Sequence, residues 1–143
     1  MKLRFLPAFA IFALLLINPC RAAIRITDDL GGSLGDYILR YSGVSQSGEK
    51  VIIDGRCYSA CTTVIALVPA KSICVTPRAR LGFHAALMPN QWGILVVNPG
   101  ATRLMFSMYP KPIRDWLDFN GGLDRRMIYI ESKYLAKLYA RCP

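Results

Sequence analysis

Ser59 and His84 are the two side chains of this sequence best suited to covalent chemistry. Ser59 lies between Cys57 and Cys61 in the stretch GRCYSACT, and His84 is the only histidine of the 143 residues. A serine hydroxyl becomes a useful nucleophile when a base takes its proton, and histidine is the most common base near neutral pH. The question is therefore whether Ser59 is a nucleophile, a helix cap, or filler inside a disulfide loop.

The place of Ser59 along the chain fits the first two roles. It follows a valine- and isoleucine-rich run and precedes an apolar run, which predicts a strand and then a helix that begins near the serine. The first N–H groups of a helix are unpaired and lie at the positive end of its dipole, so they would support a developing oxyanion. Serine is also a common N-cap residue, and the position taken alone favours the cap.

A pair of glycines upstream adds a third component. Gly31 and Gly32 separate a strand-like segment from a helix-like one, and adjacent glycines let the backbone turn tightly and present its N–H groups. The amides of Gly32 and Ala60 are therefore candidate donors of an oxyanion hole. Alone, such a turn more commonly only starts a helix, and a lone histidine is more commonly a core residue. In combination, the glycine turn, the serine and the histidine point to the same kind of site. They follow one another along the chain, with 27 residues from Gly32 to Ser59 and 25 from Ser59 to His84.

The elements that must position these residues alternate between strand and helix. Apolar periodicity predicts strands at 23–28, 50–54, 72–76 and 79–85, and helices at 31–44 and from about residue 59. Beyond His84 the sequence predicts an irregular stretch with one strand-like run at 87–100 and helices at 101–109, 112–119 and 131–142. Strand–helix alternation favours a largely parallel sheet flanked by helices, so we expect a single α/β domain.

The first 22 residues have the features of a secretory signal peptide. A basic start with Lys2 and Arg4 precedes 13 apolar residues, and small residues follow around a cleavage point after Ala22 or Ala23. The apolar run is shorter than the ~20 residues that a spanning helix needs, which predicts no integral membrane span in the mature form. The proline before Cys20 fits a lipoprotein site poorly. We expect a mature domain over 23–143 that is periplasmic or secreted.

The net charge of +9 falls to +6 when residues 1–22 are removed. A basic exported protein is attracted generically to anionic surfaces such as phospholipid head groups. The lysines and arginines are scattered, and no nucleic-acid-binding motif accompanies them, so nucleic acid is not an expected partner.

The four cysteines of the mature chain predict two disulfides with three possible pairings. Cys57 and Cys61 are four residues apart at a helix start and close enough to bond, which leaves Cys74 for Cys142. The alternative joins Cys57 or Cys61 to Cys74. The spacing lacks the C-x-x-C pairs of zinc sites and thioredoxin-type dithiols, so we expect no metal and no cofactor.

Three stretches together resemble a known family. GGSLGDY at 31–37, GRCYSACT at 55–62 and ARLGFHAA at 79–86 are similar to the glycine turn, nucleophile region and histidine strand of the Clp protease proteolytic subunit and its crotonase-fold relatives. Small exported bacterial proteins with C-x-S-A-C followed by R-L-G-F-H are the most similar in appearance. The resemblance covers about residues 24–86 and implies a ClpP/crotonase-like domain, a fold that hosts several chemistries.

Carried over by position, the resemblance implies Ser59 as nucleophile, His84 as general base, and the Gly32 and Ala60 amides as oxyanion hole. The family's aspartate would fall near Met127, where this sequence has no acid. Asp124 is the nearest candidate and Glu131 the next. If neither carboxylate reaches His84, the site is a serine–histidine dyad or is inactive.

The resemblance implies an exported serine hydrolase of the peptidase type that acts on a peptide or protein. It would work without ATP, because the sequence has no nucleotide-binding motif. The alternative is a non-catalytic module of the same fold that binds a peptide or an envelope protein. The sequence leaves the oligomeric state open, a homo-oligomer included.

Overall fold

A computed structural model describes residues 22–143 of the chain. The apolar run, Cys20 and nearly all of the predicted signal peptide lie outside the described residues. Within residues 22–143, no helix is both long and apolar enough to cross a membrane.

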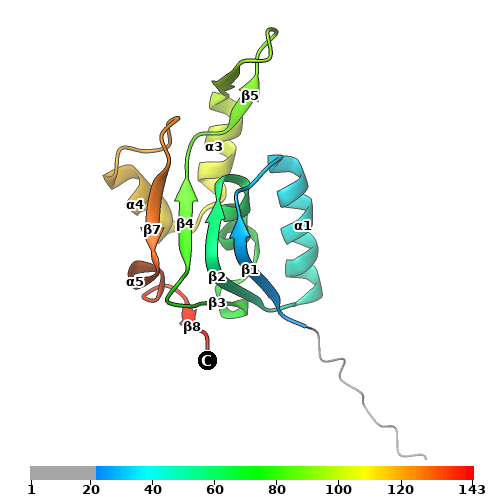
Figure 1. The fold of residues 1–143 in the computed structure, drawn as a ribbon, viewed down its shortest axis with the longest axis vertical. Helices are drawn as coiled ribbons and strands as arrows, with labels where there is room; N and C mark the ends of the chain where they lie inside the picture. The colour runs from blue at the N-terminus through cyan, green and yellow to red at the C-terminus, as the bar shows by residue number, and fades with distance from the viewer. Residues whose placement is uncertain (1–21) are drawn as a thin grey trace, which may run out of the picture.

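A six-stranded sheet forms the centre of the molecule (Figure 1). Its strands are β1 (Ile24–Asp29), β2 (Val51–Tyr58), β3 (Ile73–Val75), β4 (Arg80–Phe83), β7 (Ile128–Glu131) and β8 (Ala140–Arg141). They run in the order β7-β4-β2-β3-β8, with β1 also paired to β2. All neighbouring strands are parallel except β4 and β7, which are antiparallel. The prediction of an α/β domain with a largely parallel sheet is confirmed.

Strand β2 is the strand that brings the functional residues together. Its first half pairs with β3 and its last three residues pair with β4, so that Tyr58 is the partner of Gly82. Ser59 follows the end of β2, and His84 follows the end of β4. Because parallel strands end at the same edge of a sheet, β2 and β4 place Ser59 and His84 at one edge.

The helices and the sheet share one core. The helices are α1 (Leu34–Ser47), α2 (Val64–Leu67), α3 (Pro99–Met108), α4 (Lys111–Phe119) and α5 (Ser132–Leu135), with 3-10 turns at Ser59–Thr63 and Ala70–Ser72. Alternate residues of β2 and β4 point to this core, which holds the buried side chains of Val51, Ile53, Leu81, Phe83, Tyr41, Val64, Met105, Tyr109 and Leu117. The other face of the sheet carries charged pairs, including Arg56 with Asp28 and Arg80 with Glu131.

Both predicted disulfides are confirmed. Cys57 bonds Cys61 with a Cα–Cα distance of 5.3 Å, and Cys74 bonds Cys142 with a Cα–Cα distance of 5.1 Å. The second bridge joins residues separated by 68 positions. Closing a loop of that length stabilises the fold by about 4 kcal/mol on the chain-entropy model.

The predicted helix over 131–142 is wrong beyond its first turn. Helix α5 ends at Leu135, and the chain then turns and continues as β8, which pairs in parallel with β3. The Cys142 amide donates to the Val75 carbonyl at 3.1 Å, beside the disulfide to Cys74. A helix would rise only about 1.5 Å per residue and could not lay its end along β3 in this way.

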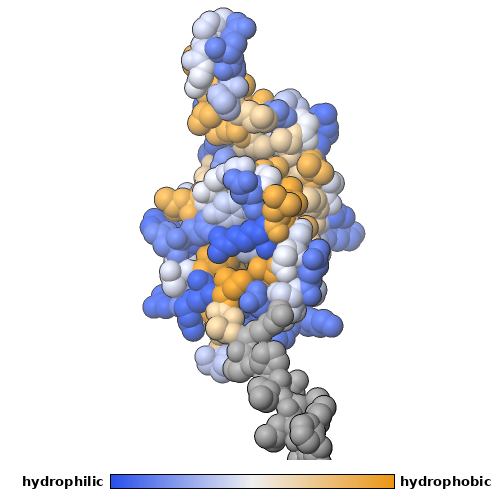
Figure 2. Space-filling view, turned by 90° about the vertical axis from the view of Figure 1, so that its right-hand side faces the viewer, coloured by the Kyte–Doolittle hydropathy of each residue, from blue (hydrophilic) through white to orange (hydrophobic). Residues whose placement is uncertain are grey.

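The stretch at 87–100 is a β-hairpin and not an irregular segment. Strands β5 (Leu87–Pro89) and β6 (Leu95–Val97) pair antiparallel and project from the end of the molecule (Figure 1). The Asn90 side chain accepts hydrogen bonds from the Trp92 and Ile94 amides and so shapes the turn. Asn98 then caps α3 by accepting from the Ala101 amide at 2.8 Å. Apolar surface gathers around the base of this projection, and its tip is more polar (Figure 2).

Candidate active site

Ser59 stands out by its backbone conformation. It has a φ of +55°, and it is the only residue other than glycine in residues 22–143 with a positive φ. A non-glycine residue held there stores about 1–2 kcal/mol of strain. The turn that follows is capped by Tyr58, and no side chain makes a cap hydrogen bond to it. Ser59 is therefore the first residue of the turn and not its N-cap.

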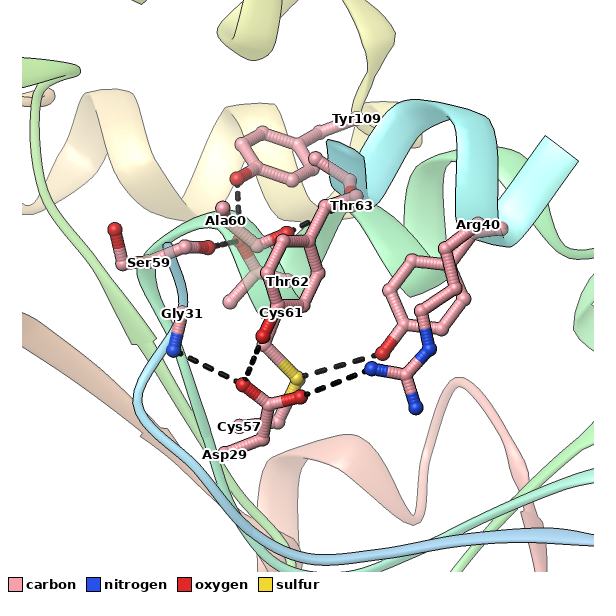
Figure 3. Close-up of a disulfide and its surroundings, with 12 residues drawn as sticks. Asp29, Gly31, Arg40, Cys57, Ser59, Ala60, Cys61, Thr62, Thr63 and Tyr109 are labelled. Atoms are coloured by element: carbon pink, nitrogen blue, oxygen red, sulfur yellow. Dashed lines mark hydrogen bonds and ion pairs between the residues drawn. A yellow bond between two sulfur atoms is a disulfide. The ribbon is translucent and has the colours of Figure 1, made fainter. Parts of the chain in front are cut away.

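The loop around Ser59 is held from several sides (Figure 3). The Thr62 hydroxyl donates to the Ser59 carbonyl at 2.6 Å, and the Thr63 hydroxyl donates to the Ala60 carbonyl at 2.8 Å. The buried Tyr109 hydroxyl bonds the Thr62 hydroxyl, and burial raises the pKa of Tyr109. These bonds and the Cys57–Cys61 bridge hold the strained serine, whose side chain points away from the disulfide in Figure 3.

The glycine turn packs directly on the serine loop. Gly31 has a φ of +86°, and a Cβ placed on it would lie 2.6 Å from the Tyr58 carbonyl oxygen, 2.7 Å from the Ser59 Cβ and 2.9 Å from the Ala60 nitrogen. Only glycine fits such an approach. At Gly32 the nearest atom would be a Tyr37 ring carbon at 3.5 Å. The close contact therefore belongs to Gly31, while Gly32 has room beside it.

A polar cluster that the sequence analysis missed fixes this turn. Asp29 accepts a hydrogen bond from the Gly31 amide at 3.0 Å and another from the Tyr37 hydroxyl. The Arg40 guanidinium lies 3.5 Å from the other carboxylate oxygen. An aspartate two residues before a glycine is the usual pattern of an Asx-turn, and this pattern was the available signal.

His84 is oriented by the main chain. Its Nδ1 lies 2.6 Å from the Ala85 carbonyl oxygen. A carbonyl can only accept, so Nδ1 carries the proton in this bond, and in the neutral imidazole this leaves on Nε2 the lone pair that a general base needs. Among the described residues, no hydrogen bond joins His84 to Ser59 or to a carboxylate.

One cleft of about 660 Å³ brings four of the predicted residues together. Gly32, Ser59, Ala60 and His84 all line it. The remaining walls come from the glycine turn, the hairpin and α3, and they carry no charged side chain. The cleft is thus an uncharged groove with the serine, the histidine and the glycine turn on its walls.

Among the described residues, no hydrogen bond joins either predicted acid to His84. The Asp124 carboxylate accepts from the Arg126 amide at 2.6 Å, and the Asp124 backbone carbonyl accepts from the Ala85 amide, next to His84. Glu131 pairs with Arg80 at 2.8 Å, at the opposite end of β4 from His84. Neither residue lines the cleft.

The groups present can support acyl transfer by a dyad. A carbonyl partner fixes the imidazole ring, but it stabilises an imidazolium less than a carboxylate would because it carries no full charge. No group of three histidine, cysteine or acidic side chains within residues 22–143 could hold a metal ion. The chemistry on offer is that of Ser59, His84 and backbone amides.

No protein-family model and no curated protein matches this sequence. Among solved structures, the chain is similar to the ClpP1 N165D mutant from Listeria monocytogenes, with 13% sequence identity and a TM-score of 0.46. The match covers 82% of this chain and 71% of that chain.

Proposed function

We propose that this protein is an exported serine hydrolase that cleaves peptide bonds with Ser59 and His84 and without ATP. One observation carries the proposal: the strained Ser59 shares a cleft with the histidine and the glycine turn. Backbone strain persists only where the surroundings enforce it, and it clusters at functional sites.

In the proposed reaction the Ser59 hydroxyl attacks the substrate carbonyl while His84 Nε2 takes its proton. The carbonyl oxygen becomes an oxyanion and accepts hydrogen bonds from the Gly32 and Ala60 amides. His84 then gives the proton to the leaving amine, which departs and leaves an acyl-serine. Water then attacks the ester while His84 takes its proton, and His84 returns that proton to the Ser59 oxygen as the acyl C–O bond breaks, which releases the carboxylic acid and the free serine. Substrate binding must first bring Ser59 and His84 into contact, because catalytic hydrogen bonds are often longer in the free enzyme.

The two disulfides support an extracytoplasmic site of action. Structural disulfides persist in oxidising compartments and are rare in the cytosol. Such compartments also lack an ATP supply, which agrees with a hydrolase that needs none.

Labelling with a fluorophosphonate probe tests the proposal. We expect the wild-type protein to gain one phosphonate by intact mass, with Ser59 as the modified residue. Ser59→Ala should abolish labelling, and His84→Gln should slow it by about 100-fold or more, as for loss of a general base. Ser33 lines the same cleft, so Ser33→Ala is the matched control and should label like wild type. An unlabelled wild type, or labelling that survives Ser59→Ala, would contradict the proposal.

A second function has one observation in its favour. His84 has no carboxylate partner among the described residues, which is what a peptide-binding module without catalysis would show. In that case the wild type stays unlabelled but binds peptides, and Leu95→Asp in the wall of the cleft weakens the binding.

A further inference from the structure

We infer that Asp29 is a positioning residue whose carboxylate holds the oxyanion turn, so that the acid of this site serves the glycine turn and not the histidine. This inference rests on the proposed function. Asp29 lies at the end of β1 and its side chain is 17% exposed.

Asp29 receives donors from three parts of the chain. The Gly31 amide and the Arg40 guanidinium point at its carboxylate (Figure 3). The Tyr37 hydroxyl donates to the same carboxylate. Burial, the hydrogen bond to Asp29 and its negative charge raise the pKa of Tyr37 to about 12. The hydroxyl therefore remains a donor at every pH at which a hydrolase would work.

This arrangement decides which amide of the turn is available. The Gly31 N–H is used by Asp29, and the described hydrogen bonds include none from the next amide, that of Gly32. An Asx-turn fixes the direction of the following peptide units. Asp29 thus leaves the Gly32 amide, on the wall of the cleft, as the free donor for an oxyanion.

The same cluster touches both halves of the oxyanion hole. Gly31 packs against Ser59 and the Ala60 nitrogen, and Asp29 is the strand partner of Cys57. Tyr41, whose ring lies under Arg40, places its hydroxyl 3.7 Å from the Cys61 sulfur. A shift of the Asp29 side chain would therefore move the glycine turn relative to the serine loop.

The rate of fluorophosphonate labelling of the full chain across pH 5–9 tests the inference. Asp29→Ala should lower the second-order rate constant by about 10- to 100-fold. This decrease in rate is no larger than the one expected when an oxyanion donor itself is removed. The loss should be the same at every pH, because the histidine keeps its Ala85 partner. Asp29→Asn keeps an acceptor oxygen for Gly31 and should recover most of the rate. Asp28→Ala is the matched control, since Asp28 is the adjacent aspartate and pairs with Arg56 on the sheet.

Two results would overturn the inference while leaving the proposed function intact. One is an Asp29→Ala rate equal to wild type. The other is a shift of the pH midpoint in Asp29→Asn, which is the signature of an acid that acts on the histidine. Circular dichroism verifies the fold of each variant.

A structural readout keeps the inference testable if the wild type does not label at all. Amide hydrogen exchange should show a protected Gly31 amide in wild type and in Asp28→Ala, and faster exchange in Asp29→Ala. A Gly31 amide that exchanges equally in all three proteins would overturn the role of Asp29. Absence of labelling by itself contradicts only the proposed function.

Discussion

Two walls of the cleft are held very differently. The serine wall consists of the glycine turn, Ser59 and Ala60, and the histidine wall consists of His84, the hairpin and α3. The serine loop is fixed by a disulfide, two threonine hydroxyls, a buried tyrosine and the Asp29 cluster. The His84 side chain has one described hydrogen bond, to a main-chain carbonyl, while the chain that follows it is held by the Ala85 amide on the Asp124 carbonyl and the Ala86 amide on the Thr102 hydroxyl before the projecting hairpin begins. The loop that carries the strained serine is therefore held by a covalent bridge and several side-chain bonds, whereas the imidazole ring of the base is held by a single hydrogen bond.

This difference indicates which side adjusts when substrate binds. Moving Ser59 would break several bonds at once, whereas the described hydrogen bonds from the hairpin strands to parts of the chain other than the hairpin and α3 are limited to that from the Arg125 guanidinium to the Leu95 carbonyl at 2.7 Å. A pre-organised nucleophile costs little reorganisation during reaction. The four predictions below test this contrast by perturbing the serine wall, in order of decreasing effect on it.

Gly31→Ala should have the largest effect. The new methyl group would lie under 3.0 Å from three atoms of the serine loop, two of them backbone atoms, at a φ that alanine disfavours. We expect a loss of about 4 kcal/mol or more in the free energy of unfolding. Urea denaturation measures it. Gly100→Ala at the start of α3, on the histidine wall, is the control and should change stability by about 1 kcal/mol at most, because its Cβ has room. An equal loss in the free energy of unfolding for Gly31→Ala and Gly100→Ala would contradict the difference between the two walls.

Removal of the short disulfide should have the next effect. The double change Cys57→Ala and Cys61→Ala should cost about 2 kcal/mol, since the loop that the bridge closes is small. It should also slow probe labelling per folded molecule, because the bridge spans Ser59. The matched removal of Cys74 and Cys142 should lower global stability more and leave labelling of the folded fraction unchanged. The opposite pattern would show that the short bridge does not brace the nucleophile.

The pKa of Tyr37 reports on its hydrogen bond to Asp29 in the serine wall. The folded pKa of about 12 lies above the ordinary value of 10, so protonated Tyr37 is favoured in the fold, and its contribution to stability is lost as pH rises from 10 through 12. Asp29→Asn should lower this pKa only partway, because burial is the larger cause. Absorbance at 295 nm, as the difference from Tyr37→Phe, reports it. An unchanged value in Asp29→Asn would contradict the hydrogen bond.

Ser59→Gly should have the smallest effect and the opposite sign. Glycine adopts the φ of +55° without strain, so the variant should be as stable as wild type or up to about 1 kcal/mol more stable, while labelling disappears. Thermal unfolding against Ser59→Ala, which keeps the strain, gives the comparison. A clear destabilisation by glycine would mean that the serine conformation is not strained.

The sequence analysis predicted the parts of the fold that depend on local periodicity. The strand–helix alternation up to residue 85 and the pairing of Cys57 with Cys61 needed only neighbouring residues. Local pattern also placed Ser59 after one predicted strand and His84 near the end of another, and the corresponding strands β2 and β4 pair in parallel and end at one edge.

The sequence analysis failed where distant contacts override local preference. Residues 136–142 have helical periodicity, but the bond between Cys142 and Cys74 and the pairing with β3 extend the chain. The acid beside the histidine stays a prediction: Glu131 pairs with Arg80 across the sheet, the Asp124 carboxylate accepts from the Arg126 amide two residues on, and neither has a described hydrogen bond to His84. Asp29 escaped notice because its role also depends on Tyr37 and Arg40, which lie 8 and 11 residues further on, in α1.

The projecting hairpin also governs how the protein behaves at high concentration. Residues 85–102 contain no charged side chain, and within residues 22–143 β5 and β6 each have only one strand neighbour, so the hairpin has open strand edges on which the described hydrogen bonds place one charged group, the Arg125 guanidinium at the Leu95 carbonyl. We expect mutual repulsion from the net positive charge to keep these edges apart at low ionic strength. Added salt screens that repulsion, and colloidal stability should fall accordingly. A lysine in place of the exposed Val96 would restore a local charge and keep concentrated solutions clear.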